Sequence, residues 1–292
     1  MQQVQYIEAK SILSRLKTED SWFGIRWNMN LYRGCQHGCI YCDTRSECYG
    51  IRDISSISVK KNALDLLRKE LLPKRKNRAT IGTGSMNDPY MPLEKELQLT
   101  RRALQIMAQE KFPVHIITKS SLVARDLDVL QDIAKVYAAV SFTITTADDS
   151  LSRKIEPQAP PTSERFMAMK MLAEKGIYTG VTLMPVLPFI NDTQENIIAL
   201  VQQAKEAGAS YILPMFGLTL RKGSREYFYQ ALDKDFAGCS EKYQARFGEQ
   251  YECFSPHYRV LSDTFKEQCM LTGLERRMQF YRPQIPEQPS LF

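Results

Sequence analysis

Three cysteines lie close together in the stretch "YRGCQHGCIYCDTRS", which runs from Tyr32 to Ser46. Cys35, Cys39 and Cys42 have the spacing C-x3-C-x2-C. Thiolates are soft ligands that suit zinc, copper(I) and iron–sulfur centres. A [4Fe–4S] cluster has four irons, so three thiolates leave one iron without a protein ligand. The spacing therefore predicts a [4Fe–4S] cluster whose open iron binds a small molecule and passes it an electron.

A zinc site is the alternative interpretation of the same cysteines. Zinc is held by three cysteines and one histidine in some structural sites, and His37 or Cys48 would be the fourth ligand here. His37 lies only two residues from Cys35, so folding back onto the same metal would strain the loop. Zinc also does not explain why this loop follows the first strand of the array described next.

Strand-like runs alternate with helical patterns between residues 24 and 215. The runs rich in β-branched and aromatic residues are 24–32, 79–84, 113–118, 137–144, 176–186 and 210–215. Leucine and methionine recur at helical spacing within 64–71, 93–107, 127–134, 166–172 and 197–204. Asp192 and Glu195 resemble a capping box that opens the last of these helices. Parallel neighbours need crossover connections, so six βα units predict an α/β fold, a partial (β/α)6 TIM-like barrel.

The chain divides into four regions on this interpretation. We expect an N-terminal segment (1–23), the partial barrel (24–215), a mainly helical C-terminal cap on the open side of the barrel (216–282) and an extended tail with three prolines (283–292). Active sites of such barrels lie at the carboxyl ends of the strands. The cysteine loop follows the first strand, so we expect the chemistry at that end.

Composition and charge limit the class of protein. Of the 292 residues, 43% are hydrophobic and 25% are charged, and the mean hydropathy is −0.34. No apolar run approaches the roughly 20 residues that span a bilayer, and the N-terminus lacks the apolar segment of a secretory signal. Clustered cysteines suit a reducing compartment. These features predict a cytoplasmic protein without a membrane partner, and the net charge of +6 permits a polyanionic one.

The cysteine spacing, with Tyr41 just before the third cysteine, resembles the signature of the radical S-adenosylmethionine (radical SAM) superfamily. The resemblance implies two cofactors, a [4Fe–4S] cluster and S-adenosylmethionine, whose cleavage gives a 5′-deoxyadenosyl radical that abstracts hydrogen from a substrate. Four stretches together resemble the spore photoproduct lyase-like group, also called DNA repair photolyases. They are "LYRGCQHGCIYCDTR", "VKKNALDLL", "GTGSMNDPYMPLE" and "LMPVLPFIND". This likeness implies a nucleic-acid substrate and repair-like chemistry on DNA.

The resemblance also implies which residues bind S-adenosylmethionine. The matching positions are Tyr41, Gly82, Thr83, Gly84, Ser85, Lys119 and Ser141. The stretch from Gly82 to Ser85 would meet the methionine amine, and Lys119 would hold the carboxylate. Ser141 would contact the nucleoside portion and Tyr41 would flank the adenine. The segment 181–184 would form the remaining wall.

The sequence departs from the lyase at the hydrogen donor. Spore photoproduct lyase has a cysteine on the second strand, three residues before an aspartate, and here Ser85 precedes Asp88 at that spacing. An O–H bond is far stronger than an S–H bond, so Ser85 is a poor donor to a carbon radical. Reversal of the thymine dimer is therefore not what we predict for this chain. The remaining cysteines, Cys48, Cys239, Cys253 and Cys269, are too irregularly spaced to suggest an auxiliary cluster.

Two alternatives to a nucleic-acid enzyme stay open. The same radical chemistry can act on a peptide, a protein or a small metabolite, and a zinc-stabilised nucleic-acid-binding protein would have no catalysis. The terminal sequence "QPSLF" bears on the first choice, because Gln288, Leu291 and Phe292 resemble the peptide by which bacterial repair proteins dock on the sliding clamp. For the superfamily chemistry, a flavodoxin or ferredoxin is the expected reductant.

Overall fold

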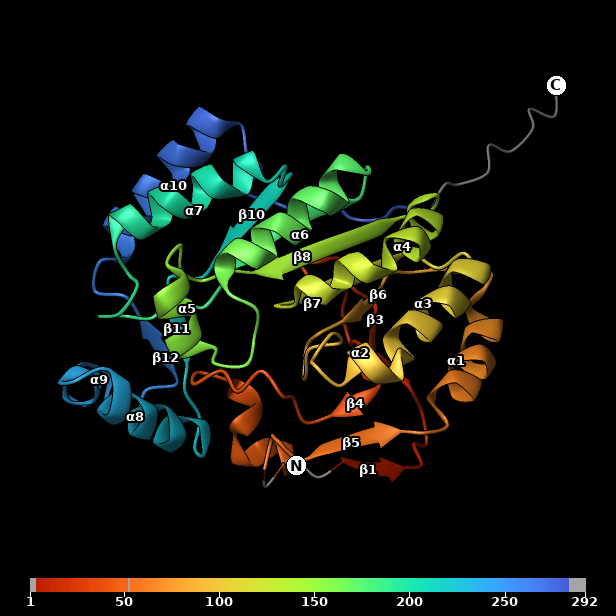
Figure 1. Cartoon of the computed structure of the whole chain (residues 1–292), viewed down its shortest axis with the longest axis horizontal. Helices are drawn as coiled ribbons and strands as arrows, with labels where there is room; N and C mark the ends of the chain where they lie inside the picture. Colours follow the sequence, from red (N-terminus) through yellow and green to blue (C-terminus); the bar gives the residue numbers. More distant parts are fainter. Residues whose placement is uncertain (1–3, 52, 284–292) are drawn as a thin grey trace.

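The computed structural model describes residues 4–51 and 53–283, and a seven-stranded sheet forms its centre (Figure 1). The order is β10-β9-β8-β7-β6-β3-β2. The strands are β2 (Leu13–Arg15), β3 (Trp27–Met29), β6 (Ile81–Thr83), β7 (Val114–Thr118), β8 (Ala138–Thr143), β9 (Tyr178–Leu183) and β10 (Tyr211–Pro214). From β3 to β10 all neighbours are parallel, and β2 pairs antiparallel with β3. Parallel strands in chain order confirm the predicted partial barrel.

The helices between these strands cover the outer face of the sheet, as the arc from α1 to α7 in Figure 1 shows. They are α1 (Ala63–Leu71), α2 (Glu94–Leu97), α3 (Leu99–Gln109), α4 (Leu127–Ala134), α5 (Asp149–Ile155), α6 (Thr162–Glu174) and α7 (Gln194–Glu206). Leu67, Leu104, Leu130, Leu172 and Leu200 are all fully buried. Each such leucine stabilises the fold by about 1.5–3 kcal/mol, so the leucine stripes form the core, as the periodicity indicates.

The capping box predicted at Asp192 and Glu195 is wrong. Thr193 caps α7, and its side chain accepts a hydrogen bond from the backbone amide of Asn196. The Asp192 carboxylate instead accepts a hydrogen bond of 2.6 Å from the hydroxyl of Ser255. The reason is a tertiary contact with the C-terminal region, which spacing within one helix does not reveal.

A small second sheet carries the start of the cysteine loop. Its order is β1-β5-β4, formed by β1 (Val4–Ile7), β4 (Tyr32–Arg33) and β5 (Ile57–Lys60). The single strand predicted for 24–32 is therefore divided between β3 and β4. The cysteine loop begins directly after β4. Its first cysteine is held in place because the amide of Cys35 donates a hydrogen bond of 2.8 Å to the carbonyl of Ile54.

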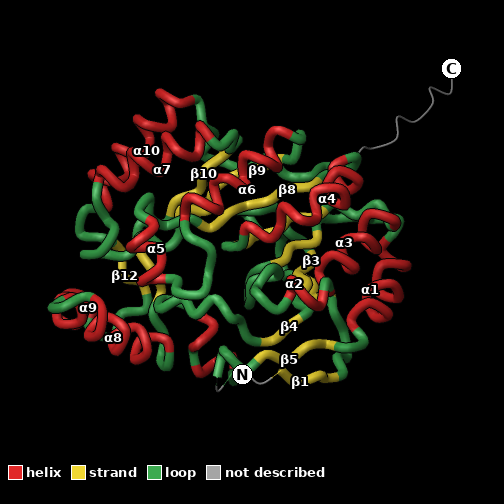
Figure 2. Tube along the Cα trace, in the orientation of Figure 1, coloured by secondary structure: helices red, strands yellow, loops and turns green. Residues whose placement is uncertain are grey.

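The C-terminal region is mainly helical, as expected, with one additional two-stranded antiparallel sheet. It contains β11 (Gly217–Thr219), α8 (Ser224–Asp235), α9 (Cys239–Phe247), β12 (Glu252–Phe254) and α10 (Tyr258–Thr272). Figure 2 places α10 beside α7, and places α8 and α9 near β12. None of the helices in the described part of the chain has the length and apolar character needed to cross a membrane.

The segment after α10 closes the open side of the partial barrel. Glu275 forms a parallel bridge with Tyr211 of β10. Five residues later, Phe280 packs so closely on Gly24 that a Cβ there would lie 2.5 Å from the ring. Met278 and Phe280 join Tyr211 in one apolar cluster. An extended segment, rather than a helix, thus spans the gap between β10 and the residues before β3.

Candidate active site

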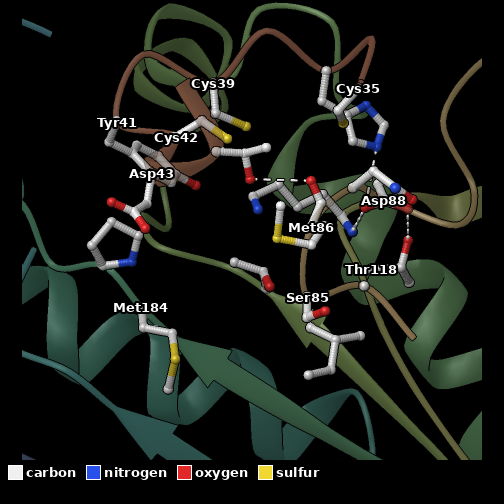
Figure 3. Close-up of a pocket in the computed structure, with 18 of the residues that line it drawn as sticks. Cys35, Cys39, Tyr41, Cys42, Asp43, Ser85, Met86, Asp88, Thr118 and Met184 are labelled. Carbon is white, nitrogen blue, oxygen red and sulfur yellow. Dashed lines mark hydrogen bonds and ion pairs between the residues drawn. The ribbon is translucent and has the colours of Figure 1, made fainter. Parts of the chain in front are cut away.

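A cavity of about 330 Å³ lies at the carboxyl ends of the barrel strands. Its lining comes from the cysteine loop, the residues that follow β6, β7, β9 and β10, the end of β8, and β11. Figure 3 shows Cys39 and Cys42 on one side of this cavity, with Ser85 and Met184 across from them. The chemistry-bearing residues therefore gather at the end of the barrel that the sequence predicts.

The three cysteines of the loop all line the cavity as free thiols. Burial raises the pKa of Cys35 to about 11 and raises that of Cys39 further, since a thiolate loses its hydration there. The backbone amides of His37 and Asp88 donate hydrogen bonds to the Cys35 sulfur. The positive charge of bound iron would offset the cost of ionising these thiols. The amides of His37 and Asp88 would further stabilise the Cys35 thiolate. The donor set thus fits an iron–sulfur cluster.

The two residues proposed as a fourth zinc ligand are engaged elsewhere. His37 Nε2 lies 3.2 Å from Asp88 Oδ2, and Cys48 is exposed and does not line the cavity. Figure 3 shows Cys35 standing apart from Cys39 and Cys42. Among residues 4–51 and 53–283, no group of three or more ligand side chains is arranged to hold a single metal ion.

Asp88 ties the cysteine loop to the end of β7. Its carboxylate accepts hydrogen bonds of 2.6 Å from the Thr118 hydroxyl and 2.6 Å from the Lys119 amide. Burial alone would raise the pKa of Asp88, but His37 and these donors hold it well below its usual range. In the sequence, Asp88 is distinguished only by its spacing of three residues from Ser85. Its position just after the second predicted strand, at the end of the barrel where the active site is expected, is the sequence signal that could have identified it as a site residue.

A buried ion pair supports the loop from the other side. The Tyr41 hydroxyl donates to the Glu156 carboxylate, and Glu156 Oε2 lies 2.6 Å from Arg165 Nη2. Arg165 also donates a hydrogen bond of 2.8 Å to the Thr143 carbonyl at the end of β8. Burial alone would raise the pKa of Glu156, but Arg165 and Lys119 lower it. The pair stays ionised and fixes Tyr41, and no sequence pattern distinguished either charge from a surface residue.

Lys119 lines the cavity beside the aromatic ring of the loop. Its Nζ lies 5.7 Å from the Tyr41 ring centroid, a cation–π contact. Burial alone would lower the pKa of Lys119, but Cys39, Glu156 and other acidic neighbours raise it above its ordinary value. Within the described residues this ammonium has no salt bridge to a carboxylate. It is therefore suited to an anionic group of a ligand.

Of the four predicted residues from Gly82 to Ser85, only the last two reach the cavity. Gly84 and Ser85 line it, whereas Gly82 and Thr83 lie below, within the strand. Gly84 has φ of +94°, and a Cβ there would lie 2.2 Å from the Ile117 carbonyl oxygen. Only glycine lets this backbone turn so close to β7.

Ser141 does not line the cavity, so the structure does not bring it together with Lys119 and Ser85. Its side chain is fully buried, with Oγ 2.7 Å from His115 Nε2 and 2.6 Å from the Tyr211 hydroxyl. Alternate residues of a strand share a face, and β8 continues for two residues, about 7 Å, beyond Ser141. Thr143 occupies the wall instead. Placing the end of β8 more closely would have identified it.

Of the other residues singled out in the sequence, some line the cavity and others are buried elsewhere. Met184 lines the cavity, whereas Val181 is buried in the main core. The remaining cysteines, Cys239, Cys253 and Cys269, are buried away from it.

A family model described as "Radical SAM superfamily" matches residues 29–201. The chain belongs to the radical SAM superfamily. Membership implies S-adenosylmethionine and a [4Fe–4S] cluster as cofactors. The match includes the three cavity cysteines and the strands from β4 to β9.

Similar sequences come from distant sources. Uncharacterized protein Rv2578c of Mycobacterium tuberculosis is 31% identical over 210 residues, covering 70% of this chain and 62% of that one. Uncharacterized protein MJ0683 of Methanocaldococcus jannaschii is 29% identical, covering 75% and 81%. A protein named radical SAM Nalpha-GlyT isomerase, of Pseudomonas phage M6, is 26% identical over 62% of this chain and 37% of its own. The chain thus spans less than two thirds of the mycobacterial relative.

Solved structures share the radical SAM fold. Spore photoproduct lyase complexed with dinucleoside spore photoproduct superposes with a TM-score of 0.70 at 16% identity, over 92% of this chain and 79% of the lyase. The radical SAM methyltransferase TsrM of Kitasatospora setae, with cobalamin and a [4Fe–4S] cluster bound, gives 0.56 at 13% identity, over 82% and 52%. At these identities the likeness shows the fold alone.

Proposed function

We propose that this radical SAM enzyme abstracts hydrogen from a nucleic acid, with DNA as the leading substrate. The observation that carries the proposal is the arrangement of three free thiols and the Lys119 ammonium around one cavity at the active end of the barrel. When bound, the cluster and S-adenosylmethionine supply a 5′-deoxyadenosyl radical. The chain's own residues hold and orient these groups.

Six of the residues that line the cavity have a specific role in this proposal. Cys35, Cys39 and Cys42 hold three irons of the cluster. Lys119 offers its ammonium to the cofactor carboxylate, and the Gly84 backbone can approach the amine because no Cβ blocks it. Thr143 takes the wall position that the resemblance implied for Ser141.

The substrate class rests on the net charge and on an arginine–aromatic contact in the segment after the cysteines. The net charge is +6, which favours a polyanion. In the stretch that follows the three cysteines, the Arg45 guanidinium stacks 3.7 Å from the Tyr227 ring centroid. Arginines and exposed aromatic rings together bind phosphates and stack on bases. The complex of spore photoproduct lyase with a dinucleoside spore photoproduct agrees with this class.

The reaction we propose needs no thiol donor at Ser85. Among the described residues that line the cavity, the only cysteines are the three proposed cluster ligands. The Tyr41 hydroxyl already donates to Glu156. Dimer reversal with a protein thiol as the hydrogen donor is therefore not the reaction we propose.

The test is made on protein purified without oxygen, with dithionite in place of the proposed flavodoxin or ferredoxin. We expect 5′-deoxyadenosine to form from S-adenosylmethionine, at a rate that DNA raises. Cys39→Ala should abolish both iron binding and product. Cys48→Ala, which changes an exposed cysteine outside the cavity, should leave them intact. Product formation that no nucleic acid changes, but that a peptide or metabolite raises, would overturn the substrate class.

Two further expectations remain proposals. A cytoplasmic location follows from composition alone. The clamp-docking residues Gln288, Leu291 and Phe292 lie outside the described residues, and anisotropy of the labelled tail peptide with sliding clamp would test them.

A further inference from the structure

A second cavity, of about 850 Å³, opens on the side of the barrel that the segment 275–280 closes. We call it the arginine pocket. The lining residues that could contact a ligand there are Trp22, Leu213, Arg276, Arg277, Phe280 and Arg282. No acidic side chain is among the described residues that line it.

The three arginines of this pocket have no protein partner in the described part of the chain. Arg276, Arg277 and Arg282 are exposed, and no salt bridge, hydrogen bond or ring contact engages their side chains there. By contrast, Arg165 and Arg221 pair with Glu156 and Asp43. Three like charges around one pocket repel one another, and a bound anion would relieve that repulsion. Guanidinium groups bind phosphate through two parallel hydrogen bonds, so a phosphate backbone suits the pocket.

An exposed tryptophan stands beside these arginines. Trp22 is 45% exposed, which is unusual for so large an apolar ring. The Asp20 carboxylate accepts hydrogen bonds from the amides of Trp22 (2.9 Å) and Phe23 (2.7 Å) and so fixes the backbone that presents the ring. A fixed aromatic face next to phosphate-binding groups is the arrangement by which proteins hold single-stranded nucleic acid.

The arginine pocket adjoins the active cavity along one strand. Leu213 and Pro214, at the end of β10, line the arginine pocket, and the next residue, Met215, lines the active cavity. Met184, also in the active cavity, belongs to the same apolar cluster as Leu213 and Phe280. A nucleic-acid strand bound at the arginines would therefore lie near the reactive centre, on the side of the barrel that the segment 275–280 closes.

We propose that the arginine pocket binds the sugar-phosphate backbone of a single-stranded stretch of the substrate, with one base stacked on Trp22. This inference rests on the proposed nucleic-acid substrate and adds where the strand is held. The pocket contributes affinity, and the chemistry stays at the cysteine loop.

The test measures binding of a fluorescein-labelled single-stranded DNA 12-mer to the loaded enzyme by anisotropy, across a salt series. The variant Arg276→Gln/Arg277→Gln/Arg282→Gln should bind at least about tenfold more weakly. If three phosphate contacts are lost, the slope of log K against log salt should shrink by about 2. Trp22→Ala should weaken binding roughly tenfold through lost stacking.

A matched control removes three charges elsewhere. Lys69→Gln/Lys170→Gln/Lys175→Gln changes three exposed lysines on or next to α1 and α6, away from both cavities, and should bind DNA nearly as the unchanged protein does. Iron content and circular dichroism show that each variant is folded.

The outcomes separate the two proposals. Equal weakening by both triple variants, an unchanged salt slope in the arginine variant, or no DNA binding by the unchanged protein would overturn the arginine pocket. DNA-dependent formation of 5′-deoxyadenosine judges the proposed function separately. If the pocket binds DNA but DNA never raises that product, the pocket stands and the proposed function fails.

Discussion

Glu156 and Arg165 form an ion pair of 2.6 Å, with both side chains almost fully buried beside the cysteine loop. Buried charges are costly to desolvate and persist only when their partners satisfy them. Glu156 also receives the Tyr41 hydroxyl, and Arg165 also donates to the Thr143 carbonyl. The pair thus joins the loop that bears the proposed cluster to the end of β8.

Removing one member of this pair should be strongly destabilising. Arg165→Met leaves the Glu156 charge buried without its partner, so we expect the free energy of unfolding to fall by about 3–5 kcal/mol. Urea denaturation of the metal-free protein measures it. Asp65→Asn, which breaks an exposed pair with Arg68, should change the same quantity by less than about 0.5 kcal/mol. Equal effects of the two variants would show that the buried pair does not support the fold.

His115 should make stability depend on pH. Burial lowers its pKa to about 3, whereas an unfolded histidine titrates near pH 6.5. As pH falls below 6.5 the unfolded chain takes up a proton that the folded chain does not, so stability is lost between pH 6.5 and about 3. This group should cost about 2 kcal/mol between pH 7 and pH 5.

The comparison variant is His115→Gln, which can still bond to Ser141. Its free energy of unfolding should fall less steeply than that of the unchanged protein over the same pH interval. Parallel pH curves for the two proteins would contradict a neutral, buried His115.

Gly84 should tolerate no side chain. In Gly84→Ala the new Cβ meets the Ile117 carbonyl oxygen at 2.2 Å, so the turn must move and the affinity for S-adenosylmethionine should drop at least about tenfold. Gly176→Ala is the control, because it also has positive φ but nothing lies within 4 Å of its Cβ. That variant should lose only about 1–2 kcal/mol of stability and keep its cofactor affinity. Calorimetry of cofactor binding decides between these results.

Ser141 and Thr143 should respond differently to substitution. Ser141→Ala leaves His115 and the Tyr211 hydroxyl without a buried partner, which costs about 1–3 kcal/mol of stability, but should not change the dissociation constant of S-adenosylmethionine. Thr143→Trp, with its side chain at the cavity wall, should weaken that binding. If Ser141→Ala alone weakens binding in a fully folded protein, the assignment of the cavity wall to Thr143 rather than Ser141 fails.

The parts predictable from sequence are those that local pattern determines. Runs of β-branched residues predict the six parallel strands, and the spacing of apolar residues predicts the helices. The spacing of Cys35, Cys39 and Cys42 predicts an iron–sulfur cluster. Lys119 follows the third of these strands, and its position in the cavity came from the same order of elements.

The missed parts depend on contacts between distant segments. Asp192 bonds to Ser255 instead of capping α7, and Glu156 meets Arg165 inside the protein. The extended segment ending at Phe280 has no strand pattern, because it packs on Gly24 rather than continuing a sheet. Such pairings are set by the tertiary fold, so propensity and periodicity do not reveal them.

The central claim is that Cys35, Cys39 and Cys42 leave one iron free for S-adenosylmethionine. The most direct measurement is electron paramagnetic resonance of the dithionite-reduced protein, prepared without oxygen, before and after adding S-adenosylmethionine labelled with 15N at the methionine amine. The account predicts a [4Fe–4S]⁺ signal that the cofactor alters, with hyperfine coupling to the labelled nitrogen. A protein with no such cluster, or a cluster whose signal the cofactor leaves unchanged and uncoupled, would contradict it.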